Sequence, residues 1–256
     1  MGNFATAELL VRLRAADVAR PARLPPELAP GTEAEAYRIQ AGVVARLGGR
    51  PAGYKASMPD ATQGLSAPVL AGNLLQSPAA IAGLAHPTRG TACYGVEPEI
   101  AFRMGRALPP HADHRSYTRD EVLAAIDSAH AALEICACRV GDFHGGPPLE
   151  RLADSIMNEG LVIGAPFADW RELDLRRLPL TLRLDGAVVH QDVGGHPLGD
   201  PLIPMVWMAN HLAGRGAGLL AGDVVTTGSC AGLHELRPGH VAEAIFGTLG
   251  GVSLQA

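Results

Sequence analysis

Lysine is nearly absent from this chain of 256 residues, because Lys55 is the single lysine whereas 20 residues are arginine. Acidic residues outnumber basic ones by 26 to 21, which gives a formal net charge of −5. No run of basic residues supplies the positive surface that nucleic-acid phosphates or anionic lipids require. We therefore expect no nucleic-acid partner and no attachment to a membrane surface.

Cysteines and long hydrophobic runs are also scarce. The cysteines are too few and too irregularly spaced for a disulfide framework: Cys93, Cys136, Cys138 and Cys230. Charged residues interrupt the first twenty positions as well as the most apolar stretch, 213–226. We therefore expect a reduced, cytoplasmic protein with no signal peptide and no transmembrane helix.

Several common catalytic motifs are missing. No Gly-x-Ser-x-Gly elbow, phosphate-binding loop or dinucleotide fingerprint stands between a predicted strand and a predicted helix. The ten histidines are scattered, and Cys136 and Cys138 lack a second pair of ligands at zinc spacing. These absences exclude the commonest serine hydrolases, kinases and dehydrogenases, and they favour the two cysteines as small buried apolar residues.

The apolar pattern predicts two helices followed by many short strands. Helices are expected over 4–19 and 32–48, on either side of a proline-rich break. Further helices are expected at 118–128, where Thr118-x-x-Glu121 forms a capping box, and at 200–216. Strands are expected at 52–57, 96–104, 130–139, 159–164, 179–184, 187–190, 223–227, 241–246 and 251–254.

The order of these elements favours an α+β fold over a doubly wound parallel sheet. The strands do not alternate with helices, and Leu184-Asp185-Gly186-Ala187 reads as a hairpin turn between two strands. No linker divides the chain. We therefore expect one unit over 1–256, with a helical N-terminal part at 1–50 and a strand-rich core at 51–256.

Three carboxylates are candidate metal ligands. Glu97 and Glu99 are two apart in a strand-like run, so both side chains face the same way, and paired carboxylate oxygens suit Mg²⁺ or Mn²⁺. The alternative is that both face water. Glu134 lies in an apolar run, where a buried carboxylate needs a metal, a proton or a basic partner. The alternative is that Glu134 lies on the solvent face of an edge strand.

Lys55 is a candidate proton carrier. Arginine serves almost everywhere else as the cation, and a guanidinium stays protonated at any working pH. An ammonium group can exchange a proton when burial or neighbouring charges change its pKa. The alternative is that a coding bias toward arginine left one lysine behind, and proximity to the carboxylates would argue against it.

The chain resembles the 2-keto-4-pentenoate hydratases and the related oxalocrotonate decarboxylases of the fumarylacetoacetate hydrolase superfamily. The most specific shared motifs are Val96-Glu97-Pro98-Glu99 and the Gly-Asp-Val-Val-x-x-Gly-Ser stretch at 222–229. The remaining shared motifs stand at 35–40, 53–55, 153–154, 162–164, 195–197 and 206–210. The resemblance therefore runs over nearly the whole chain.

The resemblance implies a mixed β-roll catalytic core with a helical N-terminal part. It implies that Mg²⁺ or Mn²⁺ is bound by Glu97, Glu99 and Glu134, and that Lys55 is the acid/base residue. Members act on small 2-oxo or 2-hydroxy-dienoate acids from the degradation of aromatic compounds. We expect a homo-oligomer, with a complex with a related pathway enzyme as a further possibility.

Two polar residues in the shared motifs are candidate substrate-binding or water-orienting groups. Asp154 and Ser229 are these candidates, with structural polar roles as the alternative. One position departs from the family: Ser66 stands nearest to the place where hydratases carry an acidic residue. The departure leaves the identity of the substrate open.

The implied reaction adds water to a 2-hydroxy-2,4-dienoate and gives a 4-hydroxy-2-oxo acid. A divalent cation stabilises the enolate of such an acid, and Lys55 moves the proton if burial and the cation lower its pKa. Decarboxylation of a 2-oxo-dienedioate is an alternative, as is C–C hydrolysis of an acylpyruvate, for which the available bases are His86, His111 and His144. A non-catalytic metal-binding paralogue or partner subunit is the alternative of another class.

Overall fold

The computed structural model describes residues 2–15, 18–81, 94–141 and 145–256. Three residues named above lie outside these ranges: His86, Cys93 and His144. The helices are α1 Gly2–Arg12, α2 Glu33–Arg46, α3 Arg119–Ala125, α4 Pro148–Ala153 and α5 Leu202–Gly214. No helix in the described part of the chain is long and apolar enough to cross a membrane.

The strands form two sheets. The first sheet runs in the order β2-β1-β10-β5-β6-β7-β3, and β11 pairs with β5. Its strands are β1 Pro51–Ser57, β2 Leu65–Leu70, β3 Leu74–Gln76, β5 Tyr94–Met104, β6 Ile126–Ala137, β7 Asn158–Ile163, β10 Val224–Ser229 and β11 His234–Glu235. Two pairs, β1 with β10 and β3 with β7, are parallel and the others are antiparallel, so the sheet is mixed.

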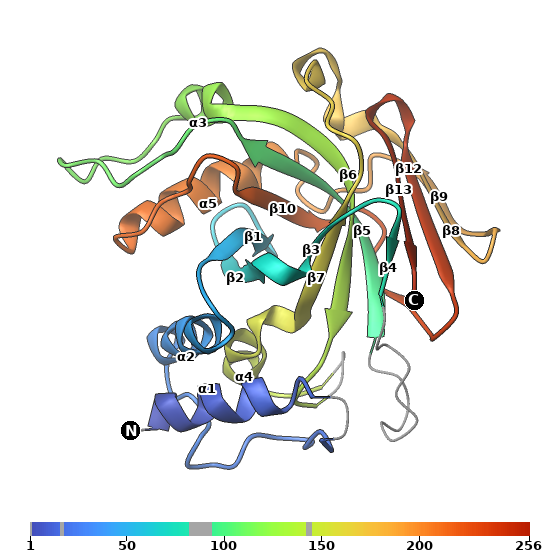
Figure 1. The fold of residues 1–256 in the computed structure, drawn as a ribbon. Helices are drawn as coiled ribbons and strands as arrows, with labels where there is room; N and C mark the ends of the chain where they lie inside the picture. Colours follow the sequence, from blue (N-terminus) through green and yellow to red (C-terminus); the bar gives the residue numbers. More distant parts are fainter. Residues whose placement is uncertain (1, 16–17, 82–93, 142–144) are drawn as a thin grey trace.

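The second sheet packs beside the first. Its order is β4-β13-β12-β8-β9, with strands β4 Ala79–Ala80, β8 Pro179–Leu184, β9 Ala187–Val193, β12 Val241–Phe246 and β13 Gly250–Gln255. Figure 1 shows β8, β9, β12 and β13 together on one side of the molecule, with α1, α2 and α4 gathered at its lower end. The main hydrophobic core joins side chains of β5 and β6 to those of β8, β12, β13 and α5. This arrangement confirms the expected α+β fold.

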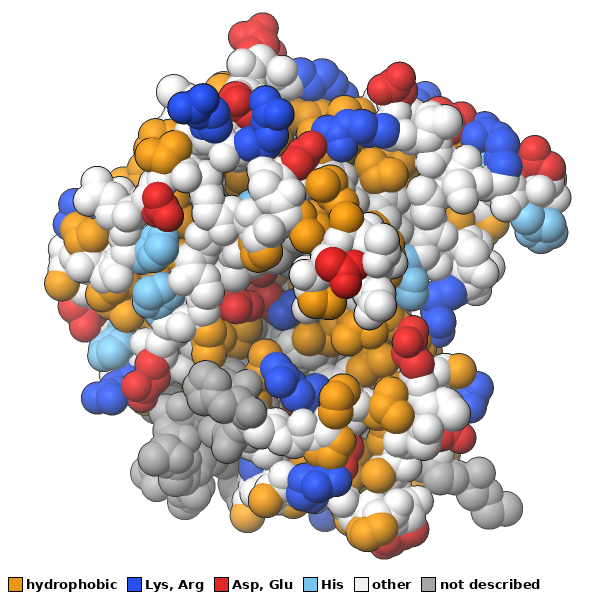
Figure 2. All heavy atoms as spheres, turned by 180° about the vertical axis from the view of Figure 1, so that it is seen from behind, with side chains coloured by type: hydrophobic (Ala, Val, Ile, Leu, Met, Phe, Trp, Pro, Cys, Tyr) orange, Lys and Arg blue, Asp and Glu red, His pale blue; other side chains and the backbone are white. Residues whose placement is uncertain are grey.

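The helical layer has its own hydrophobic cluster. Leu10 and Leu13 pack there with Ile39 and Val43, all buried, and Leu152 of α4 joins them from a distant part of the sequence. The layer is therefore built from two parts of the chain. Figure 2 shows the opposite face of the molecule, where basic and acidic side chains are interspersed and a hollow contains charged side chains of both signs.

Most predicted elements are present. Helix α4 and the short strands β3, β4 and β11 were not predicted, and there are three further differences. The first helix ends at Arg12 and is shorter than the predicted 4–19. The helix predicted over 118–128 does begin at a Thr118 capping box, but from Ile126 the chain is strand, because it pairs with β5. Strand β2 was not predicted because it contains Pro68, which an edge strand such as β2 tolerates.

Candidate active site

The register of β5 and β6 places three carboxylates on one face of the first sheet. Glu97 and Glu99 are two residues apart on β5, so their side chains project from the same side. Glu134 lies directly opposite Glu97 on the antiparallel strand β6, and Ala132 lies opposite Glu99. Directly paired side chains on one face contact each other. The strands therefore bring together the three predicted ligands.

Lys55 reaches the same place from β1. Its Nζ lies 2.7 Å from Glu134 Oε2 in a buried ion pair and donates to the carbonyl oxygen of Ile156 at 3.2 Å. Glu134 is fully buried, and its Oε1 accepts from Asn158 Nδ2 at 2.8 Å. The alternative that Glu134 lies on a solvent face is therefore wrong, and its basic partner is Lys55.

A close approach of two strands fixes the position of Lys55. Strand β1 pairs in parallel with β10, with Gly53 opposite Val224 and Lys55 opposite Thr226. A Cβ atom at Gly53 would lie 1.9 Å from the carbonyl oxygen of Val224. The glycine two residues before the lysine therefore permits the strand contact that presents Lys55 to the carboxylates.

Glu99 is fully buried and only half satisfied. Its Oε2 accepts a hydrogen bond from the Thr226 hydroxyl and another from the backbone N–H of Gly228 at 2.8 Å. Its Oε1 is buried and has no hydrogen-bond partner among the described residues. An unpaired buried carboxylate oxygen is costly, and a cation ligand would remove that cost.

The three side chains whose ligand atoms lie close enough to share one cation include Cys136 in place of the predicted Glu99. One ligand atom each from Glu97, Glu134 and Cys136 lies within 4.8 Å of the other two, and Glu99 is outside this group. The Cys136 thiol donates to Glu97 Oε2 at 3.4 Å. The sequence-based interpretation of Cys136 as a plain apolar residue is therefore incomplete. Its spacing of two residues from Glu134 on one strand is the signal that was missed.

Charges in the site shift the pKa values of its members. Burial acts to lower the pKa of Lys55, but the charges of Glu134, Cys136, Glu97 and Glu99 outweigh burial, so its pKa is raised. Burial, and then the charges of Glu134 and Glu97, raise the pKa of Glu99 well above its usual range. The expectation of a lowered pKa for Lys55 is therefore reversed while the carboxylates alone surround it.

A cavity of about 500 Å³ opens over these residues. The first sheet contributes Lys55, Glu97, Glu99 and Ser229 to its lining. His190 lines it from β9 of the second sheet, and His196 lines it from the loop after β9. The volume is in the range of sites that bind small molecules. Neither histidine was predicted as a site residue, although 195–197 is among the motifs that carry the family resemblance.

His196 is held as a neutral, fully paired imidazole. Its Nε2 lies 2.9 Å from the carbonyl oxygen of Thr227, and its Nδ1 accepts from the N–H of Leu198 at 3.2 Å. Burial lowers the pKa of His196. The preceding Gly195 has a φ of +86°, and a Cβ atom there would lie 2.3 Å from the carbonyl oxygen of Cys230. The glycine thus allows the loop to close against the cavity wall.

Of the remaining predicted residues, Ser229 lines the cavity, whereas Asp154 and His111 do not. Ser229 lines the cavity, and its hydroxyl donates to the carbonyl oxygen of Gly232 at 3.0 Å. Asp154 does not line the cavity, because its buried carboxylate is ion-paired with Arg139 and also accepts from the Arg139 N–H at 2.8 Å. The contacts of Asp154 therefore favour a structural role, which was the alternative to substrate binding. The His111 ring lies against Tyr117 in a tilted arrangement, with ring centroids 4.1 Å apart, and it does not line the cavity either.

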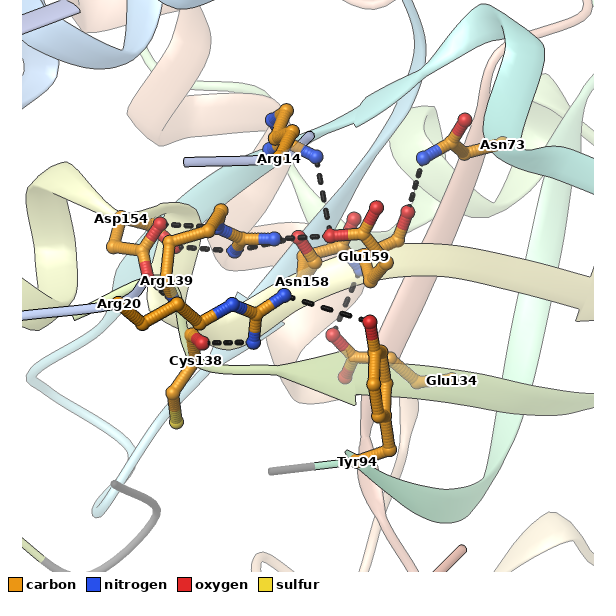
Figure 3. Close-up of polar contacts among 10 residues, drawn as sticks. All are labelled: Arg14, Arg20, Asn73, Tyr94, Glu134, Cys138, Arg139, Asp154, Asn158 and Glu159. Atoms are coloured by element: carbon orange, nitrogen blue, oxygen red, sulfur yellow. Dashed lines mark hydrogen bonds and ion pairs between the residues drawn. The ribbon is translucent and has the colours of Figure 1, made fainter. Parts of the chain in front are cut away.

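The network around Arg139 reaches Glu134 through Asn158 (Figure 3). Arg139 is fully buried and binds Asp154, Glu159 and the carbonyl oxygen of Asn158, the last at 3.0 Å. These contacts hold a turn in which three consecutive residues have positive φ angles: Ser155, Ile156 and Met157. The turn provides the carbonyl oxygen that Lys55 binds, and it ends at the Asn158 amide that Glu134 accepts from.

Ser66 faces away from the carboxylates. In the antiparallel pairing of β1 with β2, Ser66 lies opposite Ala56 whereas Lys55 lies opposite Ala67. Neighbouring residues of a strand point to opposite faces. The Ser66 hydroxyl instead lies 3.1 Å from His211 Nε2 on α5. The departure at Ser66 therefore lies behind the sheet that carries the candidate site.

The sequence of residues 61–255 matches the family model described as "Fumarylacetoacetate (FAA) hydrolase C-terminal". The chain belongs to the fumarylacetoacetate hydrolase C-terminal family. Glu97, Glu99 and Glu134 lie within the matched residues, and Lys55 lies just before them. The candidate carboxylates are therefore part of the family's shared region.

Two curated proteins are similar to this member of the fumarylacetoacetate hydrolase family. A 2-keto-4-pentenoate hydratase of Paraburkholderia xenovorans is 32% identical over 157 residues, which cover 61% of this chain and 56% of the hydratase. A 4-oxalocrotonate decarboxylase of Pseudomonas putida is 29% identical over 133 residues, which cover 52% of this chain and 50% of the decarboxylase. The matched part thus spans about half the length of each relative.

A solved structure confirms the family fold over the whole chain. The 4-oxalocrotonate decarboxylase of Pseudomonas putida G7, solved with magnesium and adipate, superposes with a TM-score of 0.82 and 23% identity. The superposition covers 99% of this chain and 96% of that one. The N-terminal helices are therefore included in the shared fold, together with both sheets.

Proposed function

We propose that this protein is a divalent-cation-dependent hydratase, which adds water to a 2-hydroxy-2,4-dienoate and gives a 4-hydroxy-2-oxo acid. The observation that carries the proposal is the buried pair of Lys55 and Glu134, beneath a cavity lined by Glu97 and Glu99. The similarity to a 2-keto-4-pentenoate hydratase supports it. The pathway we propose for this reaction is the degradation of aromatic compounds.

We propose Mg²⁺ or Mn²⁺ as the cofactor, held by Glu97, Glu99 and Glu134. The unpaired Oε1 of Glu99 and the closeness of Glu97 to Glu134 support this ligand set. Carboxylate oxygens are the donors that these hard cations prefer. When bound, such a cation polarises the carbonyl of a 2-oxo acid and offsets the negative charge of its enolate.

We propose that Lys55 moves the proton. The ion pair with Glu134 favours the ammonium form, so Lys55 acts first as an acid and protonates carbon 5 of the dienol. The 2-hydroxyl group loses its proton as the 2-oxo group forms, and this proton restores the Lys55 ammonium. Water then adds with its hydroxyl group at carbon 4 and its remaining proton at carbon 3, which completes the hydration. Glu134 and the carbonyl oxygen of Ile156 hold the ammonium in place. Ser229 lines the cavity and is the proposed contact for the substrate.

The test follows the ultraviolet absorbance of 2-hydroxypenta-2,4-dienoate in the presence of Mg²⁺ or EDTA. We expect consumption of the dienol with Mg²⁺, and a rate near that of buffer with EDTA. Lys55→Arg keeps the charge but not the proton exchange, so it should lower kcat by about 10²–10⁴. An EDTA-insensitive rate, or an active Lys55→Arg variant, contradicts the proposal. Release of carbon dioxide from a 2-hydroxymuconate-type acid would instead support the decarboxylase.

We further propose that the protein is a homo-oligomer. Strand β9 is an edge of the second sheet, and it carries exposed apolar side chains at Val188 and Val193, with exposed Ile245 on β12. Exposed apolar strand edges favour association with another chain. Light scattering coupled to size exclusion would give the subunit number, and a monomer at micromolar concentration contradicts this proposal.

A further inference from the structure

A thiol stands beside the two central carboxylates of the candidate cation site. Cys136 is fully buried and follows Glu134 by two residues on β6, so both side chains lie on the same face of the sheet. Its Sγ and one oxygen each of Glu97 and Glu134 lie within 4.8 Å of one another. Donors bound to one cation at about 2.0–2.3 Å lie at most about 4.6 Å apart, so this group is close to the size of a three-donor site.

The strand register orders the four donors into two overlapping sets. Cys136 is paired with Gly95, Glu134 with Glu97, and Ala132 with Glu99, in successive positions along one face. Glu97 and Glu134 therefore stand between Glu99 on one side and Cys136 on the other. Together with Glu99 they form an all-oxygen set, and together with Cys136 they form a mixed oxygen and sulfur set.

The charge balance and one unpaired atom also favour a bound cation. Lys55 is the only lysine or arginine among the described residues that line the cavity, whereas Glu97, Glu99 and Asp192 line it and Glu134 is ion-paired with Lys55. Glu99 Oε1 is buried without a partner, and Glu99 interacts electrostatically with both Glu97 and Glu134. Three carboxyl groups thus share one ammonium, so their ionised forms together are costly unless a proton or a further cation offsets the charge.

We propose that Cys136 is a cation ligand, which together with Glu97 and Glu134 selects Zn²⁺, Co²⁺ or Cd²⁺ over Mg²⁺. The inference rests on the proposed function, because it requires that Glu97 and Glu134 bind a cation. Sulfur ligands favour these softer cations, whereas Mg²⁺ favours oxygen alone. On binding, the S–H bond breaks, a bond between sulfur and the cation forms, and the proton leaves to solvent without any change of oxidation state.

A softer cation in this set competes with the proposed cofactor. The two sets share Glu97 and Glu134, so only one of them is filled at a time. The competing cation also shares Glu134 with Lys55, whose Nζ lies 2.7 Å from Glu134 Oε2. Zn²⁺ and Cd²⁺ are therefore expected to inhibit the enzyme by displacing Mg²⁺.

The test titrates the metal-free protein of residues 1–256 with Co²⁺ and records its absorbance spectrum. We expect the intense near-ultraviolet charge-transfer band of a thiolate bound to cobalt. The band should be lost in Cys136→Ser and kept in Cys230→Ser, which is the matched control because Cys230 is a buried thiol lining the same cavity. It should also be kept in Glu99→Gln, which lies outside the mixed set. A band that follows Cys230, or that persists without Cys136, overturns the inference.

A second measurement uses the unchanged protein and needs no variant to fold. Cd²⁺ and Ca²⁺ are similar in size, but Cd²⁺ is the softer cation. Each is added to the protein loaded with Mn²⁺, and electron paramagnetic resonance measures how much Mn²⁺ is displaced. We expect Cd²⁺ to act at a concentration lower by about tenfold or more. If Cd²⁺ and Ca²⁺ displace Mn²⁺ equally, or if Co²⁺ binds without the charge-transfer band, Cys136 is not a ligand, and the proposed function is unaffected. If neither Mn²⁺ nor Co²⁺ binds in calorimetry, the cation site of the proposed function fails as well.

Discussion

Lys55 Nζ lies 2.7 Å from Glu134 Oε2, although two strands, β10 and β5, separate the strands that carry them. Strands three positions apart in a flat sheet are about 14 Å apart, which a lysine and a glutamate side chain cannot close to a direct contact while both stand perpendicular to the sheet. The contact therefore depends on the curling of the sheet. The roll shape of the core, rather than local sequence, assembles the proposed catalytic pair.

Loss of one charge of this buried pair should destabilise the protein more than loss of both charges. Lys55→Met leaves the Glu134 carboxylate buried without its ammonium partner, and the free energy of unfolding in EDTA should fall by about 3–5 kcal/mol. Lys55→Met combined with Glu134→Gln should recover most of that loss, because no unpaired charge remains. Urea denaturation of both variants measures the difference. A double variant as unstable as the single one would show that packing, not charge, causes the loss.

Binding of Mg²⁺ should stabilise the folded protein through the carboxylates. At about 100 times its Kd, a ligand specific for the folded state adds about 2.7 kcal/mol, which for a chain of this size corresponds to a rise in Tm of roughly 5–10 °C. Glu99→Gln removes one proposed ligand and should abolish most of the rise. Glu243→Gln is the control, because Glu243 is an exposed glutamate on β12. Equal shifts in the two variants would contradict the assigned ligand.

Asp154 and Ser229 should separate into a structural and a binding residue. Asp154→Asn breaks the ion pair with buried Arg139, so the free energy of unfolding should fall by about 3–5 kcal/mol, with little change in KM for the folded fraction. Ser229→Ala should change stability by less than about 0.5 kcal/mol and raise KM, because its hydroxyl lines the cavity. Steady-state kinetics and urea denaturation distinguish the two. The reverse pattern would place Asp154 in substrate binding.

Some of this site follows from local sequence rules. The common direction of Glu97 and Glu99 follows from the alternation of side chains along a strand, and the burial of Glu134 follows from the apolar residues on either side of it. The same alternation links Cys136 to Glu134, but a cysteine in an apolar run has no local feature that separates a ligand from a packing residue.

Other parts of the site depend on contacts between distant segments. The partner of Glu134 depends on the curl of the sheet, and the role of Asp154 depends on Arg139, which no spacing rule connects to it. His196 reaches the cavity wall because Gly195 packs against the carbonyl oxygen of Cys230. Strand β2 was hidden by Pro68, whose missing N–H matters only where a strand has a neighbour on that side.

His211, which contacts Ser66, should make stability depend on pH between 6.5 and 4. Burial, and then the charge of Arg215, lower the pKa of His211 to about 4, against a usual value of 6.5. Between these values the unfolded chain binds a proton that the folded protein does not, so stability falls as the pH drops from 6.5 toward 4. His211→Gln should reduce this dependence in urea denaturation between pH 7 and pH 5, and the buried His130 and His196, whose pKa values burial also lowers, should account for part of what remains. His114→Gln, at an exposed histidine, should leave it unchanged.

The acidic residue that hydratases carry near this position should reverse the trend. Ser66 Oγ lies 3.1 Å from His211 Nε2, so Ser66→Asp places a carboxylate next to the imidazole and raises its pKa. A histidine with a raised pKa stabilises the folded state at low pH and loses that contribution as the pH rises through it. Nuclear magnetic resonance titration of His211 measures both pKa values. If Ser66→Asp leaves the His211 pKa near 4, the imidazole is governed by its burial between Tyr37 and Trp207 rather than by its partner at position 66.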